Sequence, residues 1–464
     1  MRLMTGEHPY MKQLYTKYKP HYRDNLKLAI PVIISQAGHM MVQMSDSMIV
    51  GHWVGTIALA AVSLASSVFI LILVFGLGVS YAITPLTAQE DSQGNYSECG
   101  RLLINSLLIN IICGILLFAV VYFGSAFLLD HLDQKSAEVV NEAKPLLILL
   151  GVSIIPLMVF LTFKQFAEGL GFTKQAMKIS IWGNILNICL GITFVKGLFG
   201  IHPQGICGVG YSTLIDRCLM AAVMAVYVLR AARFKKYLNN FALKSIDRAR
   251  SWTLLKMGAP VGMQYAFEAG AFVGANFIIG TISPVQQAAH QVAITLASFT
   301  YMMATGISAA ATIKSGNNFG VKNFTLLRQS AISSYHLVLV LMSATAIMFT
   351  LGNQVLPYLF TTDKAVIYFA AQLLILTAFF QLFDGTQVVG LGILRGMGDV
   401  KFPTAFTFFA YWIVGLPIGY LCGIHFKLGA VGVWYGLVLG LMVSAVLQFV
   451  RFQFISKKHS PPAP

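Results

Sequence analysis

The sequence predicts an all-α integral membrane protein with twelve transmembrane helices, arranged as two parallel six-helix repeats. Of its 464 residues, 57% are hydrophobic and only 11% are charged, whereas a soluble domain averages about 25% charged residues. The apolar residues form continuous runs of about 20, the length at which a helix crosses the hydrocarbon core. A membrane β-barrel would show shorter segments of alternating polarity, so helices are the predicted spanning elements.

Twelve apolar spans can be assigned, and all of their connections but one are short and polar. The spans cover residues 26–51, 57–88, 101–129, 143–167, 176–197, 206–231, 252–279, 286–314, 325–351, 365–393, 402–424 and 428–455. The longer connection is a basic linker that separates two sets of six spans. The predicted parts are an N-terminal interfacial segment 1–25, an N-lobe 26–231, the cytoplasmic linker 232–250, a C-lobe 251–455 and a cytoplasmic tail 456–464.

The lysine and arginine residues predict the orientation. With the N-terminus inside, 26 of the 32 basic residues lie on the cytoplasmic side and five on the other, while Arg217 lies within a span. This imbalance places both termini in the cytoplasm. The net charge of +15 therefore reflects membrane topology, and the expected partner of the surface is the lipid bilayer, not a nucleic acid.

The two halves of the chain repeat one another. LAIPV at 28–32 aligns with MGAPV at 257–261, which places Pro31 over Pro260 at a shift of 229. Further matches follow in order at shifts of 228, 227 and 223, among them Gly78 over Gly306. Because each half has an even number of spans, both halves run in the same direction. Such parallel repeats are typical of transporters that rock two bundles about a central site.

Four acidic residues fall inside the spans, where a charged side chain costs about 2.5–3.5 kcal/mol on insertion scales. They are Asp46, Asp216, Glu268 and Asp384. Asp216 stands beside Arg217, which favours a charge-compensated structural site. The other three have no basic residue in their own span, so they are the stronger candidates for a functional role.

Polar side chains accompany each of these three acids on its own helix face. Gln43, Ser45 and Ser47 surround Asp46; Gln264 and Tyr265 precede Glu268; Gln381, Thr386 and Gln387 flank Asp384. Oxygen-rich clusters suit hard cations, and a desolvated carboxyl group can carry a proton near neutral pH. Alternatively, these polar residues serve only to hold neighbouring helices together through hydrogen bonds. His290 is interpreted as a packed or hydrogen-bonded histidine of this kind.

Motifs in both halves resemble the multidrug and toxic compound extrusion (MATE) family, in its NorM-like branch. They are Pro31, Asp46 and Ser47 ahead of Gly51, FEAGAFV around Glu268, AAHQV at 288–292, FDGTQVVGLGILRGMGD at 383–399 and YWIVGLPIG at 411–419. The resemblance covers residues from about 25 to 455. It implies export of bulky cationic amphiphiles in exchange for Na⁺ or H⁺, without an organic cofactor, by a monomer in a bacterial cytoplasmic membrane.

The resemblance also implies site residues. Glu268 and Asp384 correspond to acids of the C-lobe that bind cations and substrate, and either would hold Na⁺. Asp46 corresponds to the acid of the N-lobe. The remaining candidates are Asn187 and Thr213 near Asp46, Gln264 and Tyr265 near Glu268, and Phe380 and Gln381 near Asp384. Two positions depart from the family pattern: Gly191 stands where many members have an Asn, and Phe380 where some Na⁺-coupled members have a Tyr.

Three other functions were weighed against this one. A lipid-linked oligosaccharide flippase of the same superfamily would be expected to have a basic central cavity, whereas Arg217 is the one basic residue assigned to a span. A major facilitator would have an Asp- and Arg-rich loop after the second span, but residues 89–101 read QEDSQGNYSECGR. A membrane-embedded enzyme would require a nucleophile with its base, clustered His or paired Asp motifs, so no enzymatic activity is expected.

Overall fold

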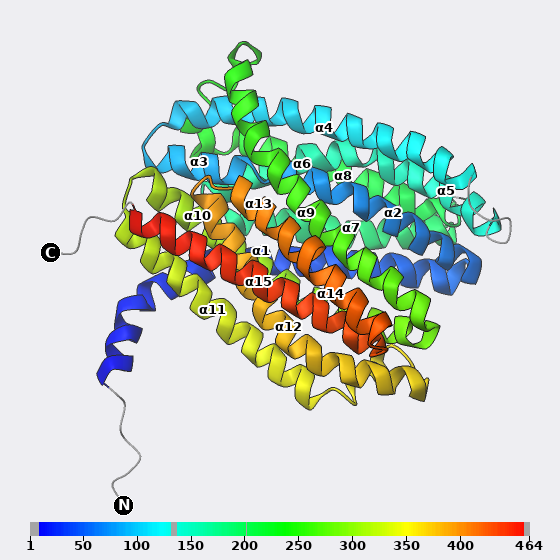
Figure 1. Ribbon diagram of the computed structural model, residues 1–464. Helices are drawn as coiled ribbons and strands as arrows, with labels where there is room; N and C mark the ends of the chain where they lie inside the picture. The colour runs from blue at the N-terminus through cyan, green and yellow to red at the C-terminus, as the bar shows by residue number, and fades with distance from the viewer. Residues whose placement is uncertain (1–8, 131–136, 201, 459–464) are drawn as a thin grey trace, which may run out of the picture. The chain divides into compact units, whose positions relative to one another are not determined.

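The computed structural model describes residues 9–130, 137–200 and 202–458 (Figure 1). Within these ranges the chain folds into helices and forms no strand, so the predicted all-α class is confirmed. Residues 1–8 and 459–464, which belong to the predicted N-terminal segment and tail, lie outside the described residues.

Each predicted span of the first half corresponds to helix, but two spans are broken. The helices are α1 (Pro9–Trp53), α2 (Thr56–Ser80), α3 (Ile83–Ser92), α4 (Tyr96–Asp130), α5 (Ala137–Val152), α6 (Ile154–Gly169), α7 (Thr173–Lys196) and α8 (Cys207–Arg230). Both breaks precede a proline, Pro85 after α2 and Pro156 after α5. A proline ring clashes with the carbonyl four residues earlier and donates no hydrogen bond, so the helix is interrupted there.

The second half has one irregular span. Its helices are α9 (Arg248–Ile282), α10 (Pro284–Gly320), α11 (Phe324–Leu351), α12 (Lys364–Gly396), α13 (Lys401–Phe408), α14 (Leu416–Tyr420) and α15 (Gly429–Lys458). Between α13 and α14 the chain widens into a π-helix, Phe409–Gly415, and a second π-helix follows at Leu421–His425. Pro417 lies just after the first widening, and such insertions accommodate a proline within an otherwise continuous span.

The basic linker packs as two short 3-10 turns, Ala232–Tyr237 and Leu243–Ser245. The Tyr237 hydroxyl donates a 2.7 Å hydrogen bond to Asp91 at the end of α3. Burial and this neighbouring carboxylate raise the pKa of Tyr237, so the phenol stays a neutral donor. Asn105 of α4 donates to the Ser245 carbonyl at 3.0 Å. The linker is thus docked on α3 and α4 and does not act as a loose tether.

Within the described residues, eleven helical segments are long and apolar enough to cross a membrane. Several of them join two helices of Figure 1, such as α5 with α6. The predicted span 26–51 is helical but more polar, because His39, Gln43 and Asp46 interrupt its apolar run. The chain is therefore an integral, multi-pass membrane protein whose α1 carries an unusual share of polar side chains.

The chain packs as two compact units that do not follow the two halves of the sequence. The N-unit contains Ile34–Gly274 and Val400–Phe409, and the C-unit contains Met1–Ile33, Ala275–Asp399 and Ala410–Pro464. Helix α1 therefore passes from the C-unit into the N-unit after Ile33, and α9 passes the other way after Gly274. The lobe boundaries at 231 and 251, which follow the order of the repeats, stay a prediction.

Each unit contains one close helix contact that the repeat relates to the other. In the N-unit, a Cβ added at Gly78 of α2 would fall on the backbone of Gly262 in α9. In the C-unit, a Cβ added at Gly306 of α10 would meet the Ile33 side chain of α1 and lie 3.0 Å from the Ala29 carbonyl. Gly78 and Gly306 are equivalent positions, as are Gly262 and Ile33. The two contacts therefore join equivalent positions of the predicted repeat.

Candidate functional site

Asp46 and Arg217 belong to one charged group inside the N-unit. Asp46 is half buried, and its Oδ1 is buried without a hydrogen-bond partner in the described part of the chain. Arg217 interacts electrostatically with both Asp46 and Asp216. Its guanidinium donates to Ser153 Oγ at 2.6 Å and lies 5.1 Å from the ring centroid of Phe69. The arginine therefore compensates a carboxylate of α1 as well as its sequence neighbour.

The structure brings Asn187 and Thr213 together, as the family resemblance implied. Asn187 Nδ2 donates to Thr213 Oγ1 at 3.4 Å, and both side chains are buried. Asn187 also interacts with the neighbouring Asp216, which is only 3% exposed. Asn187 Oδ1 and Asp216 Oδ1 have no partner among the described residues. These three residues form a buried polar cluster between α7 and α8 with unused acceptor atoms.

A buried ion pair, Lys164 with Glu168, was missed by the sequence analysis. Lys164 Nζ lies 4.0 Å from Glu168 Oε1, one turn later on α6, and donates to Ser35 Oγ of α1 at 3.2 Å. Both charged side chains are 4% exposed. Lys164 was assigned to the cytoplasmic loops, so the prediction that Arg217 alone is positive within the spans is wrong.

The error has a physical origin. Helix α6 contacts α3, α4 and α8, and every side chain from Phe160 to Gly169 is buried. The last turns of an exposed helix would carry a lysine and a glutamate into the interfacial region, but here neighbouring helices enclose them. The i, i+4 spacing of Lys164 and Glu168 was the available signal, since it places opposite charges on one helix face.

Glu268 lies on the part of α9 that belongs to the N-unit, and it is 6% exposed. Gln264, one turn earlier, is buried, and its Nε2 has no partner in the described residues. The Tyr265 ring stacks on Tyr81, the C-cap residue of α2, with centroids 5.9 Å apart. The predicted neighbours of Glu268 are therefore a buried amide with an unused donor and an aromatic ring held by α2.

Asp384 lies on α12 in the C-unit, 3% exposed, between two fully buried amides. The Tyr411 hydroxyl donates to Gln387 Oε1 at 3.0 Å. Gln381 has no hydrogen-bond partner for either polar atom among the described residues. Each unused buried polar group costs about 1–3 kcal/mol. Gln381 therefore holds unused hydrogen-bonding capacity one turn before the acid, where an ion, a water or a substrate can use it.

Phe380, Trp434 and His290 form a packed group in the C-unit. Trp434 Nε1 donates to His290 Nδ1 at 3.0 Å, and both residues are buried. The Phe380 ring packs on Trp434 at 5.3 Å. The interpretation of His290 as a hydrogen-bonded packing histidine is confirmed. Because Nδ1 accepts from the indole, a neutral ring carries its proton on Nε2.

The candidate acids are distributed over both units, with Asp46 and Glu268 in the N-unit and Asp384 in the C-unit. The pairing of Glu268 with Asp384 stays a prediction. No group of three or more His, Cys, Asp and Glu residues gathers within residues 9–130, 137–200 and 202–458. A Na⁺ ion at either acid would be held by carboxylate oxygen together with neutral oxygens, such as those of the neighbouring glutamines.

Comparisons with known proteins agree over nearly the whole chain. The sequence model of the MatE family matches residues 31–193 and 260–421. The probable multidrug resistance protein NorM of Pseudomonas putida is 30% identical over 438 residues, which cover 93% of this chain and 94% of the relative. The multidrug resistance protein MdtK of Yersinia pseudotuberculosis is 29% identical over 450 residues, 95% of this chain and 97% of the relative.

Among solved structures, a eukaryotic MATE transporter has a TM-score of 0.86 to this chain at 19% sequence identity. The match covers 96% of this chain and 99% of that one. At this identity the likeness concerns the fold. The two ranges matched by the family model begin at the equivalent residues Pro31 and Pro260, in agreement with the repeat found in the sequence.

Proposed function

Because the chain belongs to the MatE family, we propose that it is a multidrug efflux antiporter, exporting bulky organic cations in exchange for Na⁺ or H⁺. The observation that carries the proposal is the set of acids within the helices, Asp46, Glu268 and Asp384, with unused amide atoms beside two of them. Carboxylates inside membrane helices are costly, and they persist where they bind something.

The proposed cycle uses competition for the same acids. An organic cation and a Na⁺ ion or proton each neutralise a buried carboxylate, and both at once would leave excess positive charge in a region of low dielectric constant. Entry of the ion from outside therefore releases the drug. The two bundles would rock about this region, as in other transporters built from parallel repeats.

The proposed location is the cytoplasmic membrane of a bacterium, with both termini in the cytoplasm and the protein acting as a monomer. The excess of basic residues on one side supports this orientation. The named resistance proteins NorM and MdtK come from bacteria and span almost the same length as this chain.

The flippase alternative is not favoured. The sequence counts against it because only one basic residue, Arg217, was assigned to a span, and the structure weakens this argument. Lys164 adds a second buried basic group in the N-unit, but it pairs with Glu168 and so supplies no free positive charge for a diphosphate. The NorM and MdtK relatives, which match over almost their full length, are named for multidrug resistance, and this supports efflux.

The test uses proteoliposomes that contain the purified chain and a fluorescent cationic dye. A Na⁺ gradient, a pH gradient or both together are imposed across the bilayer, and dye movement is followed over time. Dye moves against the ion flux if the proposal holds, and the gradient that drives it identifies the coupling ion. Dye movement equal to that of protein-free liposomes under every gradient would contradict the proposal.

A further inference from the structure

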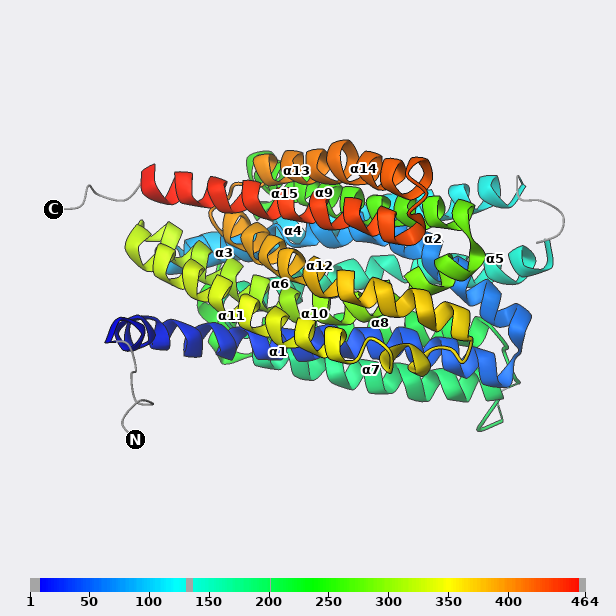
Figure 2. The same cartoon turned by 60° about the horizontal axis from the view of Figure 1, so that its bottom comes forward.

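A groove on the N-unit runs between the first part of α9 and the short helix α13, which lie beside each other in Figure 2. Its volume is about 370 Å³. It is lined by Pro260, Met263 and Phe267 of α9 and by Lys401, Thr404, Ala405 and Phe408 of α13. With the exception of Lys401 and Thr404, these side chains are apolar, so the groove suits a hydrocarbon chain.

Two contacts join the walls of the groove and keep it open between them. The Thr404 hydroxyl lies 2.8 Å from the Pro260 carbonyl, to which it donates. Further along, the Phe267 and Phe408 rings pack with centroids 4.9 Å apart. Met263 and Phe408 remain 47% and 40% exposed. The groove therefore offers apolar surface that nothing within the N-unit covers.

Positive charge gathers at one end of this groove. Lys401 is exposed and is the first residue of α13, whose N-cap Val400 supplies no side-chain acceptor. Lys256 is exposed one turn before Pro260, with its ammonium 5.4 Å from the ring centroid of Trp252. Exposed tryptophan and lysine side chains are typical of the level of the lipid headgroups.

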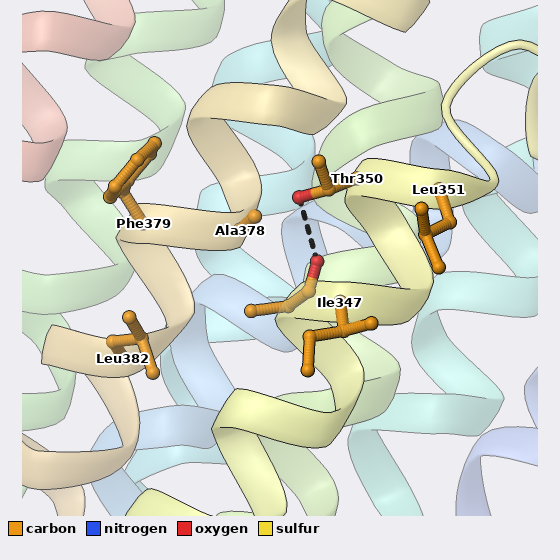
Figure 3. Close-up of a pocket in the computed structure, with 7 residues that line it drawn as sticks. Ile347, Thr350, Leu351, Ala378, Phe379 and Leu382 are labelled. Atoms are coloured by element: carbon orange, nitrogen blue, oxygen red, sulfur yellow. Dashed lines mark hydrogen bonds between the residues drawn. The ribbon is translucent and has the colours of Figure 1, made fainter.

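A second groove, in the C-unit, provides a contrast (Figure 3). It has a volume of about 300 Å³ between α11 and α12 and is lined by Ala346, Ile347, Thr350, Leu351, Ala378, Phe379 and Leu382. None of these residues is charged. The Thr350 hydroxyl donates a 2.9 Å hydrogen bond to the Ala346 carbonyl and so is not available to a ligand. This groove fits an acyl chain but has nothing that selects a headgroup.

We propose that the groove between α9 and α13 is a binding site for an anionic phospholipid. The phosphate lies against Lys256 and Lys401, and an acyl chain fills the trough along Met263 and Phe408. The bound lipid joins α13 to the first part of α9, which also carries Glu268. The site rests on the membrane location of the chain and is independent of the proposed antiport.

The experiment measures lipid binding by native mass spectrometry of the purified full chain in a neutral detergent. Phosphatidylglycerol and phosphatidylcholine with identical acyl chains are compared. Phosphatidylglycerol is expected to bind at least about tenfold more tightly, since each lysine near an anionic headgroup contributes several-fold. The double variant Lys256→Gln/Lys401→Gln is expected to bind both lipids equally, with an unchanged melting temperature.

Two further variants distinguish the groove from general surface charge. Lys174→Gln/Lys178→Gln removes an exposed i, i+4 lysine pair from α7 of the same unit, and it should leave the preference intact. Ala405→Phe fills the trough from an exposed position, and it should weaken binding of both lipids while both lysines remain.

Several results would overturn the proposal. They are equal affinity for the two lipids in the wild type, an equal loss in the α7 variant, and an unchanged preference in the Lys256→Gln/Lys401→Gln variant. Displacement of phosphatidylglycerol by millimolar inorganic phosphate would show a free-anion site instead. One-for-one displacement by the cationic dye would show that the groove is part of a drug pathway.

Discussion

The two units carry their buried polar groups in different ways. In the N-unit, opposite charges occur together: Lys164 with Glu168, and Arg217 with Asp46 and Asp216. In the described part of the C-unit, the surroundings of Asp384 on α12 are amides, with Gln381 and Gln387 fully buried. The Lys164–Glu168 pair satisfies its own charges, whereas Gln264 beside Glu268 and Gln381 beside Asp384 keep unused amide atoms that leave room for a partner from outside. Lys164 with Glu168 is therefore a structural pair, whereas Asp46, which keeps one oxygen without a partner among the described residues, stays a candidate transport charge together with Glu268 and Asp384.

The two units also differ in how the same repeat contact is made. A Cβ at Gly78 in the N-unit would meet only backbone atoms of α9, while a Cβ at the equivalent Gly306 in the C-unit would meet Cγ1 of Ile33 first and then the Ile33 nitrogen and the Ala29 carbonyl oxygen. The nearest obstacle to added volume is therefore backbone at Gly78 and a side chain at Gly306, although backbone lies close behind it there. The repeat therefore preserves the position of the close helix contact, but the atoms that meet there differ between the two units.

The largest effect is expected at the acids next to unused amides. Asp384→Asn and Glu268→Gln should each abolish gradient-driven dye export, because loss of one buried charge partner costs about 2–5 kcal/mol, or at least about thirtyfold in affinity. Dye transport in proteoliposomes measures this. Expression and melting temperature should stay close to the wild type.

The matched control for these variants is Asp24→Asn. Asp24 pairs with Lys314 at 2.8 Å on an exposed surface, where an ion pair contributes about 0–1 kcal/mol. This variant should export dye normally. Normal export by both Asp384→Asn and Glu268→Gln would contradict a transport role for the acids that stand beside unused amides.

The next effect concerns stability. Lys164→Met leaves Glu168 buried without its partner and should lower the free energy of unfolding by about 3–5 kcal/mol. The double variant Lys164→Met/Glu168→Gln should recover most of this loss, because no charge remains buried. Denaturant unfolding in detergent provides the measurement. A double variant as unstable as the single one would show that the pair is not the cause.

A smaller effect is expected at the repeat-related glycines. Overpacking a well-packed contact costs about 1–3 kcal/mol, and Gly78→Ala should lie at the upper end because its Cβ would meet backbone. Gly306→Ala should cost less and should be partly rescued by Ile33→Ala, which removes the obstructing side chain. Melting temperatures of the three variants test this order. Equal losses at both glycines, with no rescue, would contradict it.

The smallest effect is expected in the packed group beside Asp384. Trp434→Phe keeps most of the contact with Phe380 but removes the hydrogen bond to His290. The expected loss is about 1 kcal/mol, the typical value of a single hydrogen bond, with export retained. A complete loss of export with normal stability would instead assign the indole a direct part in transport.

The sequence alone predicts the all-α membrane class, the twelve helical segments and the repeat. These features follow from apolar runs, prolines and glycines at fixed spacing, which are local properties of the chain. It also identifies Glu268, Asp384 and Asp46 as unusual, because a carboxylate in an apolar run is visible without a structure. The helix breaks before Pro85 and Pro156 are also local features, because each follows from a proline in the sequence. The predicted spans 57–88 and 143–167 nevertheless run through them without a break.

Only the tertiary structure decides which charges are compensated and how the helices are shared between units. Lys164 is buried because α3, α4 and α8 enclose α6, and Arg217 reaches Asp46 from a distant helix. Likewise, α1 and α9 each contribute to both units because their packing partners change along their length. Burial and pairing are properties of neighbours from elsewhere in the chain. A hydropathy pattern describes each helix separately, so it cannot predict which side chains are buried or paired by other helices.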